Sequence, residues 1–131
     1  MKKACITCLI LIVFLGCKKS ESNQNENGVI GIWTYIENKI GLGGPGEWLP
    51  ANPSNQVIVF KANGSFIPAQ SFLQGCSNYE IIDSATLKFN PTSTSLGYSI
   101  MNYRVEQGGK ILYLSPISPA CFEGCSYKFQ R

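Results

Sequence analysis

Cysteine is the residue type in this chain with the most chemistry to offer. The 131 residues include six cysteines and no histidine. Without an imidazole, the chain can form neither a Ser-His-Asp nor a Cys-His catalytic arrangement, and it has no histidine general base. Carboxylates that could act as a pair are scattered, with no spacing that sets two together: Glu47, Glu80, Asp83, Glu106 and Glu123. A pair assembled by the fold, as in glycoside hydrolases, is the alternative to a solvated surface. We therefore expect that the protein is not an enzyme.

Three of the cysteines, Cys5, Cys8 and Cys17, belong to the N-terminal stretch MKKACITCLILIVFLGC. Lys2 and Lys3 give this stretch a positive start, and an apolar run of about a dozen residues follows. Such a run fits an export signal and is shorter than the ~20 residues that span a bilayer. Residues 1–16 are therefore expected to be a signal peptide, which removes Cys5 and Cys8 with it.

The end of that stretch, Phe14-Leu15-Gly16-Cys17, resembles the lipobox of bacterial lipoproteins. The resemblance implies that Cys17 accepts a diacylglyceryl group as a thioether and anchors the protein in membrane lipid. Each buried methylene contributes about 0.8 kcal/mol, so the acyl chains would hold the protein nearly permanently. Phe14 departs from the aliphatic residue usual in the family. The alternative is a secretory signal with an Ala-x-Ala cleavage site, and no such tripeptide precedes Cys17.

Residues 17–28 form a polar stretch without an apolar side chain after Cys17. Such a stretch cannot bury a core, so we expect a flexible tether between lipid and domain. Lys18 stands where lipoproteins retained in the inner membrane commonly have aspartate. The resemblance therefore implies an outer-membrane lipoprotein that faces the periplasm or the cell surface.

The charge balance is nearly neutral. The whole chain carries +3, and loss of Lys2 and Lys3 leaves nine basic against eight acidic side chains, a net charge of +1. Arg104 and Arg131 are the only arginines. This composition has no basic patch for nucleic acid, so we expect no nucleic-acid partner.

Residues 29–131 read as one domain of short strands and turns, with no helical period sustained for three turns. Asn63-Gly64 marks a hairpin turn, and Met101, Tyr103 and Val105 alternate with polar residues. The glycine- and proline-rich passage from 41 to 55 predicts a long loop, and a second loop is expected near 91–98. Strands are expected at 30–36, 56–61, 66–67, 78–82, 86–90, 99–106, 110–114 and 126–130. About eight short strands predict a small antiparallel barrel or sandwich.

Several motifs resemble lipocalins and, taken in order, the lipocalin-like lipoproteins frequent in Bacteroidota. Gly31-Ile32-Trp33 is similar to the lipocalin Gly-x-Trp signature. The other matching segments are 59–66, Cys76-x-x-Tyr79-x-Ile81, 111–115 and 121–129. The resemblance implies an all-β, up-and-down barrel of about eight strands on a lipid anchor, and it supplies architecture more than function.

The domain retains Cys76, Cys121 and Cys125. In an exported protein a disulfide is the default, and an odd count leaves one thiol over. Pairing of Cys121 with Cys125 is favoured over a pairing that uses Cys76. Three thiolates without histidine lack a fourth zinc ligand, so neither a metal nor another cofactor is expected.

Ligand contacts are expected at the interior and mouth of the barrel, where amphipathic rings could line a pocket: Trp33, Trp48, Tyr79 and Tyr103. Packing of these rings into the core is the favoured alternative, because a barrel of about eight strands is just wide enough for its own side chains. Trp48 is the best candidate, because it falls in the expected loop where no core demands it.

Two functions follow from this reading. The first is an envelope lipoprotein whose barrel binds a small apolar ligand. The second is a non-catalytic protein-interaction or structural lipoprotein whose filled barrel presents loops, especially 41–55 and 91–98, to an envelope protein or host partner. A cavity with apolar walls would favour the first, and a packed interior with a flat exposed apolar patch around Trp48 would favour the second.

Overall fold

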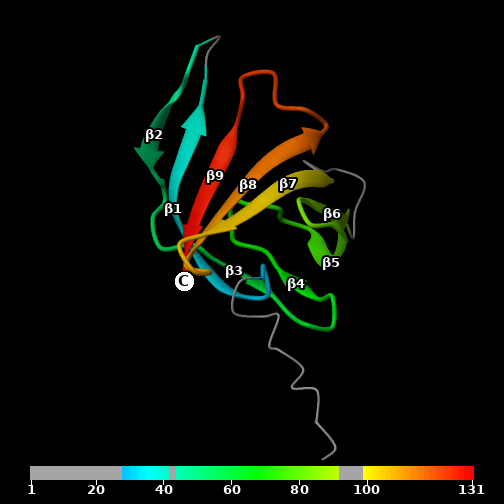
Figure 1. The fold of residues 1–131 in the computed structure, drawn as a ribbon. Coiled ribbons are helices and arrows are strands. Elements are labelled where there is room, and N and C mark those ends of the chain that lie inside the picture. The colour runs from blue at the N-terminus through cyan, green and yellow to red at the C-terminus, as the bar shows by residue number, and fades with distance from the viewer. Residues whose placement is uncertain (1–27, 42–43, 92–98) are drawn as a thin grey trace, which may run out of the picture.

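The computed structural model describes residues 28–41, 44–91 and 99–131, and these residues form one curved antiparallel sheet (Figure 1). The expected signal peptide 1–16, the lipidation site Cys17 and the tether up to residue 27 lie outside the described residues. So do residues 42–43 and 92–98 of the two expected loops.

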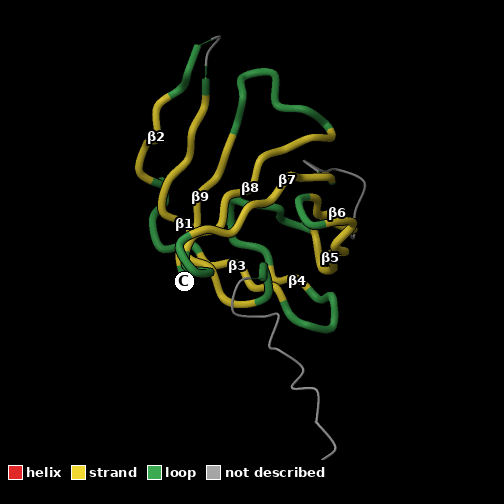
Figure 2. The backbone as a smooth tube through the Cα atoms, viewed as in Figure 1, coloured by secondary structure: helices red, strands yellow, loops and turns green. Residues whose placement is uncertain are grey.

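The described residues are strands and loops, without a helix (Figure 2). No helix in these ranges is therefore long and apolar enough to cross a membrane. The strands are β1 Gly31–Ile40, β2 Glu47–Pro50, β3 Val57–Phe60, β4 Phe66–Ile67, β5 Cys76–Asp83, β6 Thr86–Pro91, β7 Ile100–Glu106, β8 Ile111–Ser118 and β9 Ser126–Gln130.

The strand order is β4-β3-β1-β9-β8-β7-β6-β5, with β2 paired to β1. β3 pairs the first half of β1 and β2 pairs the second half, both on the edge opposite β9. β2 and β3 therefore occupy one position as an interrupted strand, which leaves eight positions around the sheet. Neighbours are consecutive in the chain and the first strand pairs the last, as in an up-and-down barrel.

The remaining gap lies between β4 and β5. A single bridge joins Ser65 to Asn78, and the Tyr79 amide donates to the Gly64 carbonyl at 2.8 Å. The sheet is thus nearly closed, and the predicted all-β antiparallel barrel of about eight strands is confirmed.

Aromatic rings occupy the inside of this sheet. One group surrounds Phe60, whose ring centre lies 4.9–6.0 Å from those of Phe66, Tyr79 and Phe89. A second group contains Tyr35, Phe72, Tyr127 and Phe129, with ring centres 4.7–6.4 Å apart. Fully buried aliphatic residues pack with them: Val29, Ile58, Leu87, Met101, Leu112 and Leu114. Such burial is the main favourable contribution to folding.

The passage from 41 to 55 was wrongly predicted to be all loop. β1 continues to Ile40, and β2 pairs with it in the register Lys39↔Trp48. The connection is tight, because a Cβ at Gly41 or Gly46 would come within 2.8 Å of backbone atoms. In the described sheet β2 has one neighbouring strand, β1. Proline is tolerated in such an edge strand, so Pro50 can end β2 although it lacks an amide hydrogen.

The interruption between β2 and β3 is held by the buried Gln56. Its Oε1 accepts hydrogen bonds from the Ser71 amide at 2.9 Å and hydroxyl at 2.6 Å, and its backbone carbonyl accepts from the Tyr35 amide at 2.7 Å. These bonds satisfy the polar groups that the interruption buries.

The hairpin turn at Asn63-Gly64 is confirmed between β3 and β4. Its geometry differs in one respect: of these two residues, only Gly64 has a positive φ, of 82°. Asn63 contributes through its side chain instead, because its Oδ1 accepts a hydrogen bond from the Ser65 amide at 3.0 Å.

The two ends of the barrel are distinct. At one end lie the C-terminus and the start of β1, and at the other lie the β1–β2 hairpin and the loop that joins β8 to β9 (Figure 1). Arg131 joins Gly28 and Ile30 at the first end, because its guanidinium donates to both carbonyls. At the second end the Gly41 amide donates to the Glu123 carbonyl at 2.6 Å.

Candidate functional site

Two of the four predicted ligand-binding residues, Trp33 and Tyr79, lie in the core. Trp33 is fully buried, and its Nε1 donates to the Val29 carbonyl at 2.7 Å. The hydroxyl of the buried Tyr79 donates to the Lys61 carbonyl at 2.9 Å. Burial raises the pKa of the Tyr79 phenol. Both polar tips therefore have partners within the protein, as buried tips usually do.

The other two, Trp48 and Tyr103, contribute to a recess of about 540 Å³. This volume lies within the range of roughly 300–1,000 Å³ typical of ligand sites. We call it the outer recess, and it is lined by Lys39, Trp48, Asn102, Tyr103, Arg104, Tyr113, Ser115 and Ser126. Tyr103 also packs against the core.

The outer recess lies on the face of the sheet opposite the core. In β8, Leu112 and Leu114 are fully buried, so the alternating Tyr113 and Ser115 point to the other face. The same alternation along β7 places Asn102 and Arg104 outward, because Met101 is buried and Tyr103 packs against the core. The recess therefore lies on an outer surface, whereas ligand contacts were expected at the interior and mouth of the barrel.

Strand register assembles the recess from residues distant in the chain. One row across the sheet is Trp48, Lys39, Ser126, Ser115 and Asn102, contributed in that order by β2, β1, β9, β8 and β7. The adjacent row is Glu37, Lys128, Tyr113 and Arg104. In β1, Ile36 forms a bulge between the buried Tyr35 and Glu37. The bulge reverses the alternation of side chains, so Glu37 and Lys39 face outward.

Two aromatic rings form the walls of the recess. The ring centres of Trp48 and Tyr113 lie 5.7 Å apart, with their planes at 60°. The Arg104 guanidinium lies 4.6 Å from the Tyr113 ring centre, and Lys128 Nζ lies 5.8 Å from that of Trp48. Cations over ring faces stabilise this arrangement, so the rings are held in place before any ligand arrives.

Carboxylates neutralise two of the three nearby cations. Lys128 Nζ contacts Glu37 at 2.5 Å, and this hydrogen bond raises the pKa of Lys128. Arg104 pairs with Glu106 at 2.6 Å. Lys39 has no carboxylate partner among the described residues, so its charge at the recess is not compensated.

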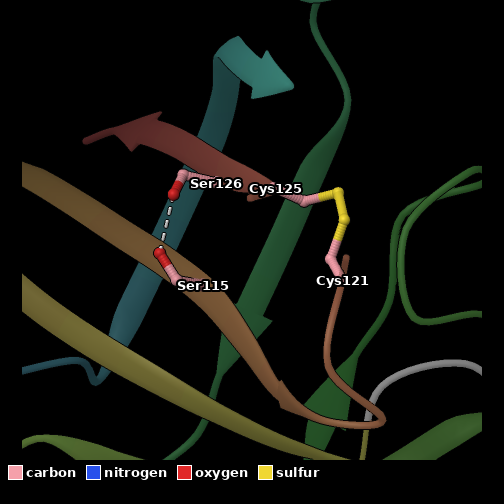
Figure 3. Close-up of a disulfide and its surroundings, with 4 residues drawn as sticks. All are labelled: Ser115, Cys121, Cys125 and Ser126. Carbon is pink, nitrogen blue, oxygen red and sulfur yellow. Dashed lines mark hydrogen bonds between the residues drawn. A yellow bond between two sulfur atoms is a disulfide. The ribbon is translucent and has the colours of Figure 1, made fainter. Parts of the chain in front are cut away.

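Hydroxyl groups lie beside the rings. The Ser115 and Ser126 hydroxyls hydrogen-bond to each other at 2.8 Å, and Figure 3 shows them facing each other next to the disulfide. Each hydroxyl has one donor hydrogen and two acceptor lone pairs, so the pair retains bonding capacity. The exposed Asn102 amide adds two donors and an acceptor.

The structure pairs Cys121 with Cys125, the favoured alternative, with 5.6 Å between the Cα atoms (Figure 3). This separation lies in the usual range for a disulfide. Ser126 directly follows Cys125, so the disulfide adjoins the recess at the start of β9. Cys76 is a free thiol buried in the core, and burial raises its pKa.

The described residues contain no group of three or more cysteine, aspartate or glutamate side chains placed to hold a metal ion. In the same ranges, Glu37 and Glu106 each pair with a cation, and Asp83 is exposed at the β5–β6 turn. The Ala85 amide lowers the pKa of Asp83 by hydrogen bonding to its carboxylate.

Sequence reasoning missed six residues as members of a site: Lys39, Asn102, Arg104, Tyr113, Ser115 and Ser126. The outward alternation of Asn102 and Arg104 was readable within the strand predicted at 99–106. The assembly of all six residues into one recess could not be read from the sequence, because it depends on the register of five strands and on the bulge at Ile36.

Comparison with protein-family models, with curated proteins and with solved structures finds no match to this chain.

Proposed function

We propose that this protein is a non-catalytic, lipid-anchored lipoprotein of the bacterial outer membrane whose barrel is a filled scaffold for binding at its outer surface. The observation that carries the proposal is the contrast between the two faces of the sheet. Aromatic rings in mutual contact occupy the inner face. The outer face bears a recess with rings, hydroxyls and a lysine that has no carboxylate partner among the described residues.

The packed inner face argues against a carrier of small apolar molecules. Trp33, Phe60, Phe89 and Phe129 are all fully buried there. A ligand inside the barrel would have to separate rings that now contact each other. Loss of this buried aromatic packing would cost on the order of several kcal/mol of folding free energy. The apolar-ligand hypothesis therefore has less support than surface binding.

The position of the recess along the barrel supports the same proposal. Gly28, the first described residue, is bonded to Arg131 at the C-terminal end. β1 has ten residues and so spans on the order of 30 Å. Lys39 lies near its other end and pairs there with Ser126 of β9. A lipid anchor at Cys17 would attach the protein at the first end, so the recess lies on the half of the barrel away from the attached end.

Membrane attachment is tested by Cys17→Ala. The expected result is release of the protein from the membrane fraction of its host, since the two or three acyl chains are lost. Cys76→Ala is the matched control and should stay with the membrane. Membrane retention of the Cys17→Ala protein would contradict the lipid anchor.

The filled scaffold is tested by native mass spectrometry of the full chain purified from its host. We expect a mass that corresponds to the acylated chain alone. A stoichiometric apolar small molecule in every preparation would overturn the filled scaffold and restore the apolar-ligand hypothesis.

A further inference from the structure

The outer recess has the chemistry of a site for one particular class of ligand. Its Trp48 ring is 36% exposed and lies 5.7 Å from the Tyr113 ring, with the planes at 60°, so the two rings together form an aromatic wall. The face of an aromatic ring is negatively polarised and attracts positively polarised C–H groups. A sugar ring has such C–H groups on its faces and hydroxyls around its rim.

The polar groups of the recess match that rim. Ser115, Ser126 and Asn102 form one row across neighbouring strands, within the same recess as the two rings. A purely apolar ligand would leave these groups without partners and lose their hydration, which costs free energy. A hydroxyl-rich ligand would satisfy them while its C–H face packs on the rings.

The charge of the recess selects further. Lys128 and Arg104 are paired to Glu37 and Glu106, and Lys39 alone among these cations has no carboxylate within the described residues. The Lys39 ammonium can therefore form an ion pair with one carboxylate of a ligand bound beside the rings. A strongly acidic peptide carries carboxylates but lacks the hydroxyl-bearing ring that would bond to the polar row and pack on the aromatic rings.

We infer that the outer recess binds an acidic carbohydrate, with a sugar ring packed on Trp48 and Tyr113, its hydroxyls bonded to Ser115, Ser126 and Asn102, and its carboxylate near Lys39. This inference rests on the proposed function, because it names the ligand class of the same recess. Binding is non-covalent and involves no reaction.

The test titrates the full chain, in micelles of a detergent without a sugar head group, with tetragalacturonic acid and with the neutral maltotetraose. Tryptophan fluorescence is the readout, because Trp33 is fully buried and Trp48 is 36% exposed in the recess. We expect saturable binding of the acidic tetrasaccharide and weaker binding of the neutral one. Absence of saturable binding to tetragalacturonic acid would overturn the inference.

Two variants separate the contributions of the ring and the charge. By calorimetry, Trp48→Ala should weaken binding of tetragalacturonic acid about tenfold or more, because a stacking face is lost. Lys39→Gln should weaken it roughly threefold to fivefold and leave maltotetraose unaffected, because an exposed ion pair contributes up to about 1 kcal/mol. Unchanged affinity in either variant would contradict the assigned contacts.

Matched controls test whether these effects are local. Phe122→Ala removes a fully exposed ring and Lys88→Gln removes an exposed charge on β6, both outside the recess, and both should leave affinity unchanged. A polyglutamate peptide serves as the acidic ligand without sugar. Binding of polyglutamate as tightly as tetragalacturonic acid would overturn the carbohydrate assignment in favour of an acidic peptide.

Failure of this inference and failure of the proposed function give different results. If tetragalacturonic acid does not bind and the protein still carries no small molecule by native mass spectrometry, the ligand class is wrong and the filled scaffold stands. If an apolar molecule is found inside the barrel, the proposed function fails whatever the sugar titration gives.

Discussion

The guanidinium of Arg131 lies 4.4 Å from the ring centre of Trp33, joining the last residue of the chain to the buried tryptophan of its first strand. The same guanidinium donates hydrogen bonds to the carbonyls of Gly28, Ile30 and Gly109. One side chain thus closes the end of the barrel at which the described chain begins, and joins β1 to the turn between β7 and β8.

Replacing Arg131 should therefore destabilise the fold. For Arg131→Ala we expect a loss of roughly 1–3 kcal/mol in the free energy of unfolding, since a cation–π contact and several charge-assisted hydrogen bonds disappear. Urea denaturation measures this. Arg104→Ala is the control: its guanidinium also lies over a ring, but at an exposed ion pair, so the loss should stay below about 1 kcal/mol. Equal losses in the two variants would contradict the role given to Arg131.

The filled interior predicts a large effect at Phe129, which is fully buried and contacts Tyr35 and Phe72. Phe129→Ala should cost about 3–5 kcal/mol of unfolding free energy, because the substitution leaves a cavity among packed rings. Ile32→Ala, at a residue 63% exposed on the outer face of β1, should change stability by about 0.5 kcal/mol or less. A loss at Phe129 as small as that at Ile32 would argue for a loosely filled barrel.

Cys76 should be unreactive in the folded protein. Its thiol is buried and its pKa is raised, so little thiolate is exposed to an alkylating reagent near neutral pH. Under non-reducing conditions the mature chain should react with iodoacetamide only after denaturation, and then at one thiol, because Cys121 and Cys125 are bonded and the proposed acylation would block Cys17. Mass spectrometry locates the label. Rapid labelling of Cys76 in the native protein would contradict its burial.

Stability should fall above about pH 10. Burial raises the pKa of Tyr35, Tyr79 and Tyr103 above the usual 10.0, with the Asp83 charge contributing at Tyr103. Because each folded-state pKa exceeds the unfolded value, the stabilising contribution is complete below pH 10 and is lost as pH rises through the folded values. Ultraviolet titration of phenolate, alongside thermal melts, measures both effects.

Tyr79→Phe tests that alkaline loss directly. At neutral pH it should cost about 1 kcal/mol, since the hydrogen bond to the Lys61 carbonyl disappears. Above pH 10 the variant should lose stability less steeply than the unsubstituted protein, because one buried phenol no longer ionises on unfolding. An identical pH slope in both proteins would show that Tyr79 does not contribute to it.

Local patterns in the chain were sufficient to place most strands. Alternation from Met101 to Glu106 predicted which face of β7 packs on the core, and the last strand was predicted at the residues where β9 is found. These features follow from a period of two and from local turn chemistry, in which near neighbours in the chain decide the conformation. The strand at Trp48 escaped prediction because β2 is short, exposed, and defined only by its pairing with β1.

Composition and short-range pattern determined that this protein is all-β and lacks histidine chemistry, and the N-terminal stretch predicts a lipoprotein signal by resemblance. Only the tertiary structure decided that Trp33 is a core residue and that Trp48 lies with Tyr113 and Lys39 on the opposite face. The physical reason is register: a shift of one residue between strands moves every side chain to the other face. In β1 the bulge at Ile36 reverses the alternation, so that Tyr35 faces inward and Glu37 outward.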